Sequence, residues 1–541
     1  MNLKTILPIG AAVMLSGCGL VAEEAGRKTP ADYVNPYIGN VSHMLVPTFP
    51  NVHLPNSMLR VVPEREDYTS DRINGLPIVV TNHREKSAFN LSPFQGERNA
   101  LTPIIAYSYD NEELHPYSYS VFLDEPEINV RFAPSHQSAV YEMALNPDLP
   151  AYIIVNSGNG ALTCEGNVVK GYRNLDNGVR VYLFMETMQI PKEVYAVGNE
   201  GSERATNASG DNACLAINYD ESTDRVNLRY GVSLISEEQA ERNLHREITN
   251  YDVDSVANAG KEIWDNLLGK FEVETDNEDD KTIFYTALYR VAECPICISE
   301  DGRYFNASDG KVHDDEGHPF YTDNRVELTD FDSPFDYRWD ETHNIPDLIM
   351  LMGGPQAFNN ALDEMYGTPL GKSKFDFYAQ YPDHTGNVGR FSMADESSLH
   401  VPYLYNYSGQ PWKTQKRIRS LMRQWFRNDL MGMPGEEEGG SLSGFIVYSM
   451  LGFYPVTPDE PAYTVGSPIF SRVVIHLDNG KDLEIIAHDQ SESNKYIQSA
   501  RINGKELTSP WFSREDIKDG GRIEFVMGPK ANYDWGKQPS A

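Results

Sequence analysis

The chain has 541 residues, which is enough for a large core and for two or three domains. Its 79 Asp and Glu residues outnumber its 46 Lys and Arg residues, so the formal net charge is −33. Because nucleic-acid binding needs a basic face, this charge argues against nucleic acid as a partner. It suits an exported protein, or one that handles a divalent cation or a neutral substrate.

Residues 1–18 have the pattern of a lipoprotein signal peptide. Lys4 supplies a positive charge, an apolar run over 6–15 follows, and Leu15-Ser16-Gly17-Cys18 resembles a bacterial lipobox. The apolar run is too short to span a bilayer. We predict cleavage before Cys18 and a lipid on its sulfur, which would anchor the exported protein to a membrane in the periplasm or at the cell surface. Ordinary secretory cleavage is the alternative, and residues 19–30 would form a tether.

Residues 31–235 are predicted to form a β-sandwich. Short apolar runs alternate there with clusters of Gly, Asn, Asp and Pro, a pattern typical of many short strands joined by turns. The clearest runs cover 78–80, 117–123, 128–132, 152–155 and 179–184.

The periodicity becomes helical near Ser236, where Ser236-Glu237-Glu238-Gln239 reads as a capping box. We predict linker helices over 236–270, a helical domain over 271–456 and a C-terminal β segment over 457–541. The fold class is therefore multidomain, with β structure followed by α structure and a small β piece.

An acidic loop precedes one apolar helix of the helical part. Glycines flank three consecutive glutamates over 435–440, and small and apolar residues follow over 441–451. A helix N-terminus has unpaired N–H groups and a dipole that favours negative charge. Spacing alone leaves two interpretations open: glutamates that decorate a helix N-terminus, or a pair of site carboxylates on a rigid turn.

A specific combination of motifs is spread along the chain. The motifs are Val34-Asn35-Pro36-Tyr37-Ile38-Gly39, Asp301-Gly302-Arg303-Tyr304, Tyr337-Arg338-Trp339 with His343-Asn344, Gly409-Gln410-Pro411-Trp412, and the stretch 433–456. This combination resembles glycoside hydrolase family 92, the calcium-dependent exo-acting α-mannosidases. The resemblance implies a β-sandwich packed on an (α/α)6 barrel, with the site between them. It also implies removal of terminal α-linked mannose from glycans or glycoproteins.

The resemblance implies inverting chemistry, in which one carboxylic acid protonates the leaving oxygen and a carboxylate across the ring activates water. It places Glu438 as the base and Glu436 as its helper, where the family usually has aspartates. It places Asp395 and Glu396 as ligands of Ca²⁺, an ion that takes oxygen ligands. Trp339 and His343 would line the sugar site.

The position that the family uses for the general acid falls on Phe331, which cannot donate a proton. Asp330 and Asp332 flank it, so either would have to serve as the acid; the alternative is that both are ordinary loop acids.

Only the seven residues 324–330 separate two matched regions, where the family has a sugar-contacting motif and a long series of helices. We therefore predict an incomplete (α/α)6-type helical domain with apolar helix faces left uncovered. Two functions stay open: a calcium-dependent α-mannosidase, and a catalytically impaired glycan-binding lipoprotein or internally deleted family relic.

Overall fold

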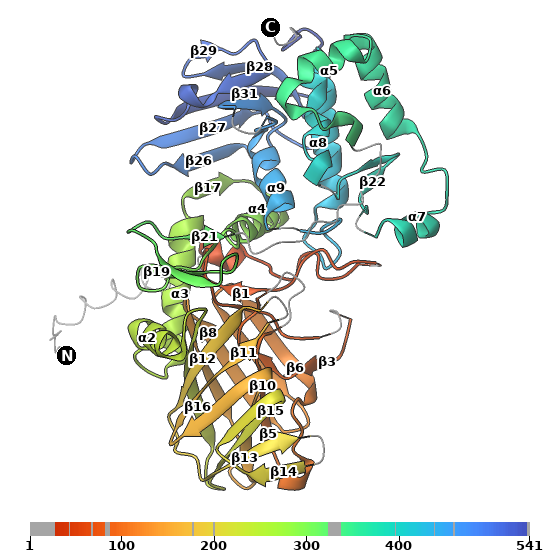
Figure 1. Ribbon diagram of the computed structural model, residues 1–541. Coiled ribbons are helices and arrows are strands. Elements are labelled where there is room, and N and C mark those ends of the chain that lie inside the picture. Colours follow the sequence, from red (N-terminus) through yellow and green to blue (C-terminus); the bar gives the residue numbers. More distant parts are fainter. Residues whose placement is uncertain are drawn as a thin grey trace, which may run out of the picture.

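The computed structural model has a lower lobe of strands and an upper lobe in which helices lie beside a second sheet (Figure 1). It describes residues 28–42, 44–65, 69–81, 87–175, 178–198, 201–322, 337–382, 384–394, 396–437, 439–457 and 460–537. The predicted signal peptide and Cys18 lie outside these residues. In the described ranges, no helix has both the length and the apolar character needed to cross a membrane.

The lower lobe is the predicted β-sandwich. Its main sheet has 14 strands and runs in the order β14-β13-β15-β10-β11-β12-β16-β9-β8-β7-β6-β3, with β5 pairing β10 and β4. The bounds are β1 (Val52–His53), β2 (Arg60–Val61), β3 (Arg72–Asn74), β4 (Leu76–Pro77), β5 (Asn90–Gln95), β6 (Ala106–His115), β7 (Ser118–Leu123), β8 (Ile128–Pro134), β9 (Ser138–Ala144), β10 (Ala151–Glu165), β11 (Val168–Asn174), β12 (Arg180–Thr187), β13 (Glu193–Gly198), β14 (Gly201–Arg204), β15 (Asn207–Tyr219) and β16 (Arg225–Ser233).

Alternating side chains build the core of this lobe. In β7, Tyr119, Val121 and Leu123 are buried while the residues between them are half-buried, which is the period of a strand with one face on a core. They share one apolar cluster with residues of β10 and β16. The run 78–80, predicted as a strand, forms only an isolated bridge between Val80 and Ser87.

Two helices, α2 (Glu237–Glu247) and α3 (Val253–Leu268), connect the lobes. Ser236 caps α2 by accepting a hydrogen bond from the Gln239 N–H at 3.1 Å, as predicted. The Gln239 side chain does not return to the cap; it donates to Asn243 and to Asp301. The capping box is therefore only half formed, because the glutamine side chain instead ties α2 to the turn at Asp301.

The upper lobe contains a six-stranded sheet in the order β17-β26-β27-β31-β28-β29. Its edge strand β17 follows α3 directly. One edge of the sheet therefore comes from residues far upstream of the C-terminal β segment. The strands outside the lower lobe are β17 (Phe271–Glu274), β18 (Ile296–Cys297), β19 (Arg303–Asn306), β20 (Lys311–Asp314), β21 (Tyr321–Thr322), β22 (Asn387–Val388), β23 (Phe391–Ser392), β24 (Phe453–Tyr454), β25 (Ala462–Val465), β26 (Arg472–His476), β27 (Asp482–His488), β28 (Tyr496–Ile502), β29 (Lys505–Glu506), β30 (Trp511–Ser513) and β31 (Gly521–Gly528).

The helical part is incomplete, as predicted. An (α/α)6 barrel has six pairs of helices, whereas the described residues from 271 to 456 form six α-helices in all. Met350, Leu351 and Phe375 are 68%, 86% and 77% exposed, so apolar helix faces are left uncovered. The helices are α4 (Glu278–Val291), α5 (Ile345–Leu351), α6 (Pro355–Gly367), α7 (Lys374–Gln380), α8 (Pro411–Trp425) and α9 (Ser441–Leu451), with short 3-10 helices η3 (Tyr337–Trp339), η4 (Thr342–Asn344), η5 (Glu396–Ser398) and η6 (Val401–Asn406).

The apolar helix α9 lies at the centre of the upper lobe. Leu442, Phe445, Ile446 and Met450 are buried, and they belong to the cluster that joins the helices to the second sheet. A helix that is apolar on every side is stable only inside a protein. The acidic loop in front of α9 is therefore attached to a rigid, enclosed element.

Candidate active site

The acidic loop turns sharply where its glycines contact other segments. Gly435 has a positive φ of 70°, and a side-chain Cβ there would lie 2.4 Å from the Ala394 carbonyl oxygen. Gly440, with a φ of 98°, is the N-cap of α9, and a Cβ there would lie 2.9 Å from Val291 Cα. Glycine is required at both positions because a left-handed backbone and a close approach coincide.

Glu437 anchors the middle of this loop. Its N–H donates to the Pro47 carbonyl at 2.8 Å, and its Oε2 accepts the N–H of Ser443 in the first turn of α9 at 3.0 Å. The pKa of the Glu437 carboxyl is raised to about 7, because burial raises it more than the charge of Arg290 on α4 lowers it, and the charge of Glu396 also raises it. The helix N-terminus holds this carboxylate because it offers unpaired N–H groups.

The predicted base residues flank Glu437. Glu436 is half-buried and has polar partners. Glu438 lies outside the described residues, as do the predicted acids Asp330 and Asp332. The structure therefore leaves the predicted roles of all four glutamate and aspartate side chains untested.

The predicted calcium ligand Glu396 lies beside the acidic loop. It begins η5, and its Oε1 accepts a hydrogen bond of 2.6 Å from the Ser441 hydroxyl, at the first residue of α9. Burial raises the pKa of Tyr454 most, and the charges of Tyr448 and Glu396 raise it as well. Two motifs that the sequence separates by 45 residues thus meet at one place. Asp395 lies outside the described residues.

Trp339 and His343 are placed differently from one another. The Trp339 side chain is 1% exposed, its Nε1–H donates to Met365 Sδ at 3.2 Å, and its ring packs edge-on against Phe358. It therefore lies in the core of the helical part, and its predicted place beside the sugar stays a prediction. The His343 side chain is 77% exposed and lies 3.5 Å from a Glu341 carboxylate oxygen.

The donors around the acidic loop suit a hard cation. The described side chains there offer oxygen: the carboxylates of Glu436 and Glu396 and the hydroxyl of Ser441. Calcium takes such ligands. Within the described ranges no group of three or more His, Cys, Asp and Glu side chains converges as a metal site, and Asp395 and Glu438 lie outside them. The donor chemistry thus fits calcium.

Sequence reasoning missed Glu437 and Arg290. Glu437 lies inside the recognised acidic loop, but roles were predicted only for the two glutamates that flank it. Arg290 follows a run of apolar residues in α4 and was not considered. Arg290 is only 3% exposed and donates to the carbonyl of Ile38 at 2.5 Å. An arginine in the apolar C-terminal half of α4 was the available signal, because buried charges need partners.

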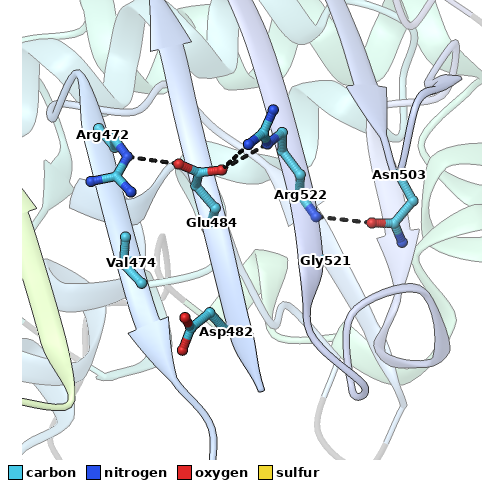
Figure 2. A pocket seen from close by; sticks show the side chains of 7 residues that line it. All are labelled: Arg472, Val474, Asp482, Glu484, Asn503, Gly521 and Arg522. Atoms are coloured by element: carbon cyan, nitrogen blue, oxygen red, sulfur yellow. Dashed lines mark hydrogen bonds and ion pairs between the residues drawn. The ribbon is translucent and has the colours of Figure 1, made fainter. Parts of the chain in front are cut away.

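A groove on the second sheet is lined by residues other than those described above (Figure 2). The Glu484 carboxylate of β27 accepts hydrogen bonds of 2.7 Å from Nε of Arg472 and from Nε of Arg522. The backbone N–H of Arg522 donates to the Asn503 side-chain oxygen. These side chains pair with one another across the sheet face. The groove therefore presents a closed ion network and is not the candidate active site.

Comparison with known proteins identifies the same two regions that the motifs marked. Residues 33–233 match the model of the glycosyl hydrolase family 92 N-terminal domain, and residues 239–327 and 325–529 match that of the family's catalytic domain. An uncharacterized secreted glycosidase from Arthroderma benhamiae is 30% identical over 197 residues, which is 36% of this chain and 23% of that protein. This chain therefore matches less than a quarter of that relative's length.

Solved structures share the fold. The family GH92 inverting mannosidase BT2199 from Bacteroides thetaiotaomicron superposes with a TM-score of 0.82 at 21% identity, covering 95% of this chain and 99% of that one. The family GH92 α-mannosidase BT3965 of the same organism, in complex with mannoimidazole, gives 0.85 at 18% identity, covering 94% and 96%. These similarities confirm the predicted fold class.

Proposed function

The chain belongs to glycosyl hydrolase family 92, and from this premise we propose that it removes terminal α-linked mannose from glycans by exo-acting, inverting hydrolysis that depends on calcium. The observation that carries the proposal is the hydrogen bond between Ser441 and Glu396. It brings the acidic loop and the calcium-binding motif together, as a site assembled from both requires.

The proposed roles follow the inverting mechanism. Glu438 accepts a proton from the attacking water, Glu436 assists it, and Asp332 or Asp330 protonates the leaving oxygen. Each glutamate is one methylene longer than the aspartate that the family usually has at its position. Since about 1 Å of misplacement can cost about a hundredfold in rate, we expect slow turnover.

Asp395 and Glu396 would hold Ca²⁺, which supplies a positive charge for the hydroxyls of the mannose ring when it is bound. Ser441 orients the Glu396 carboxylate through its hydroxyl. His343 is exposed and remains a proposed sugar contact.

A glycan-binding family relic is the second candidate. The incomplete helical part favours it, because the exposed Met350, Leu351 and Phe375 mark helix faces that have no described cover. The presence of Phe331 at the position that the family uses for the general acid supports it as well.

One assay separates the two candidates. Mannose release from α-mannosides is followed with Ca²⁺ and with EDTA, and the anomer first formed is identified by NMR. Release of β-mannose that EDTA abolishes supports the hydrolase. Saturable binding of mannosides without release supports the relic.

The proposed location is outside the cytoplasm, with a lipid anchor on Cys18. The secreted relative supports export. Expressed with its own leader in a bacterium, the wild-type chain should incorporate a lipid label and fractionate with membranes. Cys18→Ser should do neither. Equal fractionation and labelling of both would contradict the anchor.

A further inference from the structure

A segment near the N-terminus, residues 36–47, forms hydrogen bonds with the region that carries the acidic loop. The N–H groups of Gly39 and Val41 donate to the carbonyls of Asp429 and Leu430, at 3.3 and 2.9 Å. Pro47 then accepts the N–H of Glu437 at 2.8 Å. The segment that leads into the β-sandwich therefore reaches the helical part on the side where the acidic loop lies.

Arg290 of α4 also forms hydrogen bonds with this segment. Its guanidinium donates to the carbonyls of Pro36 and Ile38, at 3.3 and 2.5 Å, although it is almost fully buried. Burial lowers the pKa of this arginine, and the negative charge of Glu437 opposes that shift. Arginine and glutamate thus stabilise one another across the segment without a direct hydrogen bond.

The Glu437 carboxylate is directed away from solvent. One oxygen, Oε2, accepts the Ser443 N–H, while Oε1 is buried and has no hydrogen-bond partner within the described residues. Burying a carboxylate in this way is costly, and the cost is tolerated where the group has a task. Here the task is local: the residue joins the N-terminal segment to the first turn of α9.

We propose that Glu437 is a positioning residue, whose hydrogen bonds to Pro47 and Ser443 hold the acidic loop in place beside its neighbour Glu436. The loop is rich in glycine and would otherwise be conformationally free. Catalytic groups need placement within about 0.5 Å, which an anchored adjacent residue can provide. This inference rests on the proposed function of the loop.

Two substitutions of nearly equal volume test the inference. Glu437→Gln keeps an oxygen that can accept the Ser443 N–H, whereas Glu437→Met keeps the size and removes the acceptor. We expect Glu437→Met to lower kcat by about tenfold or more with KM nearly unchanged, and Glu437→Gln to stay within about threefold of the wild type. Glu506→Gln, on the exposed strand β29, is the control.

Glu437→Gln alone keeps the inference falsifiable if Glu437→Met does not fold. A Gln variant as inactive as a base knockout would overturn the inference, because the carboxylate would then act through its charge. Wild-type kcat in Glu437→Met would overturn it too.

Hydrogen–deuterium exchange separates this inference from the proposed function, because it does not require turnover. In Glu437→Met we expect the amides of 433–445 to exchange about tenfold faster or more, with those of β26 and β27 unchanged and Glu437→Gln close to the wild type. If the wild type releases no mannose, the hydrolase proposal fails, and this pattern still supports the anchoring role. Equal exchange in all variants overturns it.

Discussion

The hydroxyl of Ser441 donates a hydrogen bond of 2.6 Å to Oε1 of Glu396, and so joins the first residue of α9 to the start of η5. The acidic loop ends immediately before Ser441. This hydrogen bond therefore links the two motifs directly.

Replacing Ser441 by alanine should weaken calcium binding. The substitution leaves the Glu396 carboxylate without its hydroxyl partner, and a hydrogen bond to a charged group contributes about 1.5–3 kcal/mol. We expect the calcium-induced rise in Tm to shrink. Ser420→Ala is the control, because the Ser420 hydroxyl bonds only within its own helix, to the Lys416 carbonyl at 2.8 Å. An unchanged calcium response in Ser441→Ala would contradict the link.

Gly435→Ala should disrupt the acidic loop. The new Cβ would lie 2.4 Å from the Ala394 carbonyl oxygen, in a backbone conformation that L-residues rarely adopt. Gly310→Ala is a matched control, because its φ of 68° is similar and no atom lies within 4 Å of its Cβ position. The control should lose only about 1 kcal/mol in free energy of unfolding. Gly435→Ala should lose more and release less mannose. Equal Tm values for the two variants would count against the close contact.

Glu293→Gln should destabilise the junction between the lobes. Glu293 pairs with Arg60 of β2, and the side chains are only 12% and 6% exposed. Removing the charge of Glu293 weakens an ion pair that is largely shielded from water, so the free energy of unfolding should fall by more than it does at an exposed pair. Asp478→Asn, which breaks an ion pair with Lys270 in which Asp478 is 90% exposed, should cost about 0–1 kcal/mol. Urea unfolding measures both, and similar losses would refute the difference.

Glu300 should make stability fall as pH rises. Burial raises the pKa of its carboxyl in the folded protein, although the Leu234 N–H and Asn243 side chain oppose the rise. Between the unfolded pKa and the folded one, the folded state holds the extra proton. This contribution is complete below the unfolded pKa and is lost as pH rises through the folded pKa. Glu300→Gln removes it.

The Tm of the wild type should therefore decline relative to that of Glu300→Gln as pH is raised from about 4.5 towards neutrality. Glu506→Gln, on an exposed strand, should follow the wild type at every pH. A constant difference between the wild type and Glu300→Gln across this range would show that Glu300 does not titrate there.

Local patterns were enough for much of the fold. The alternation in β7 and the Ser236 cap of α2 were both predicted, because each depends on neighbours within a few residues. The pairing of β17 with β26 was not predicted, since about two hundred residues separate them and no local signal records which edge a strand joins. Trp339 shows the same limit: its motif was recognised, but only packing placed its ring in the core.

The sequence by itself determined the order of β and α regions and the acidic loop before α9, because these are properties of periodicity and local composition. The resemblance of its motifs indicated the family and the shortened helical part. Only the tertiary structure decided that Glu396 meets Ser441 and that Glu437 joins Pro47 to the first turn of α9. The physical reason is that these relationships depend on distances between remote segments. Three identical side chains at consecutive positions differ only in the residues that surround each of them in the folded protein.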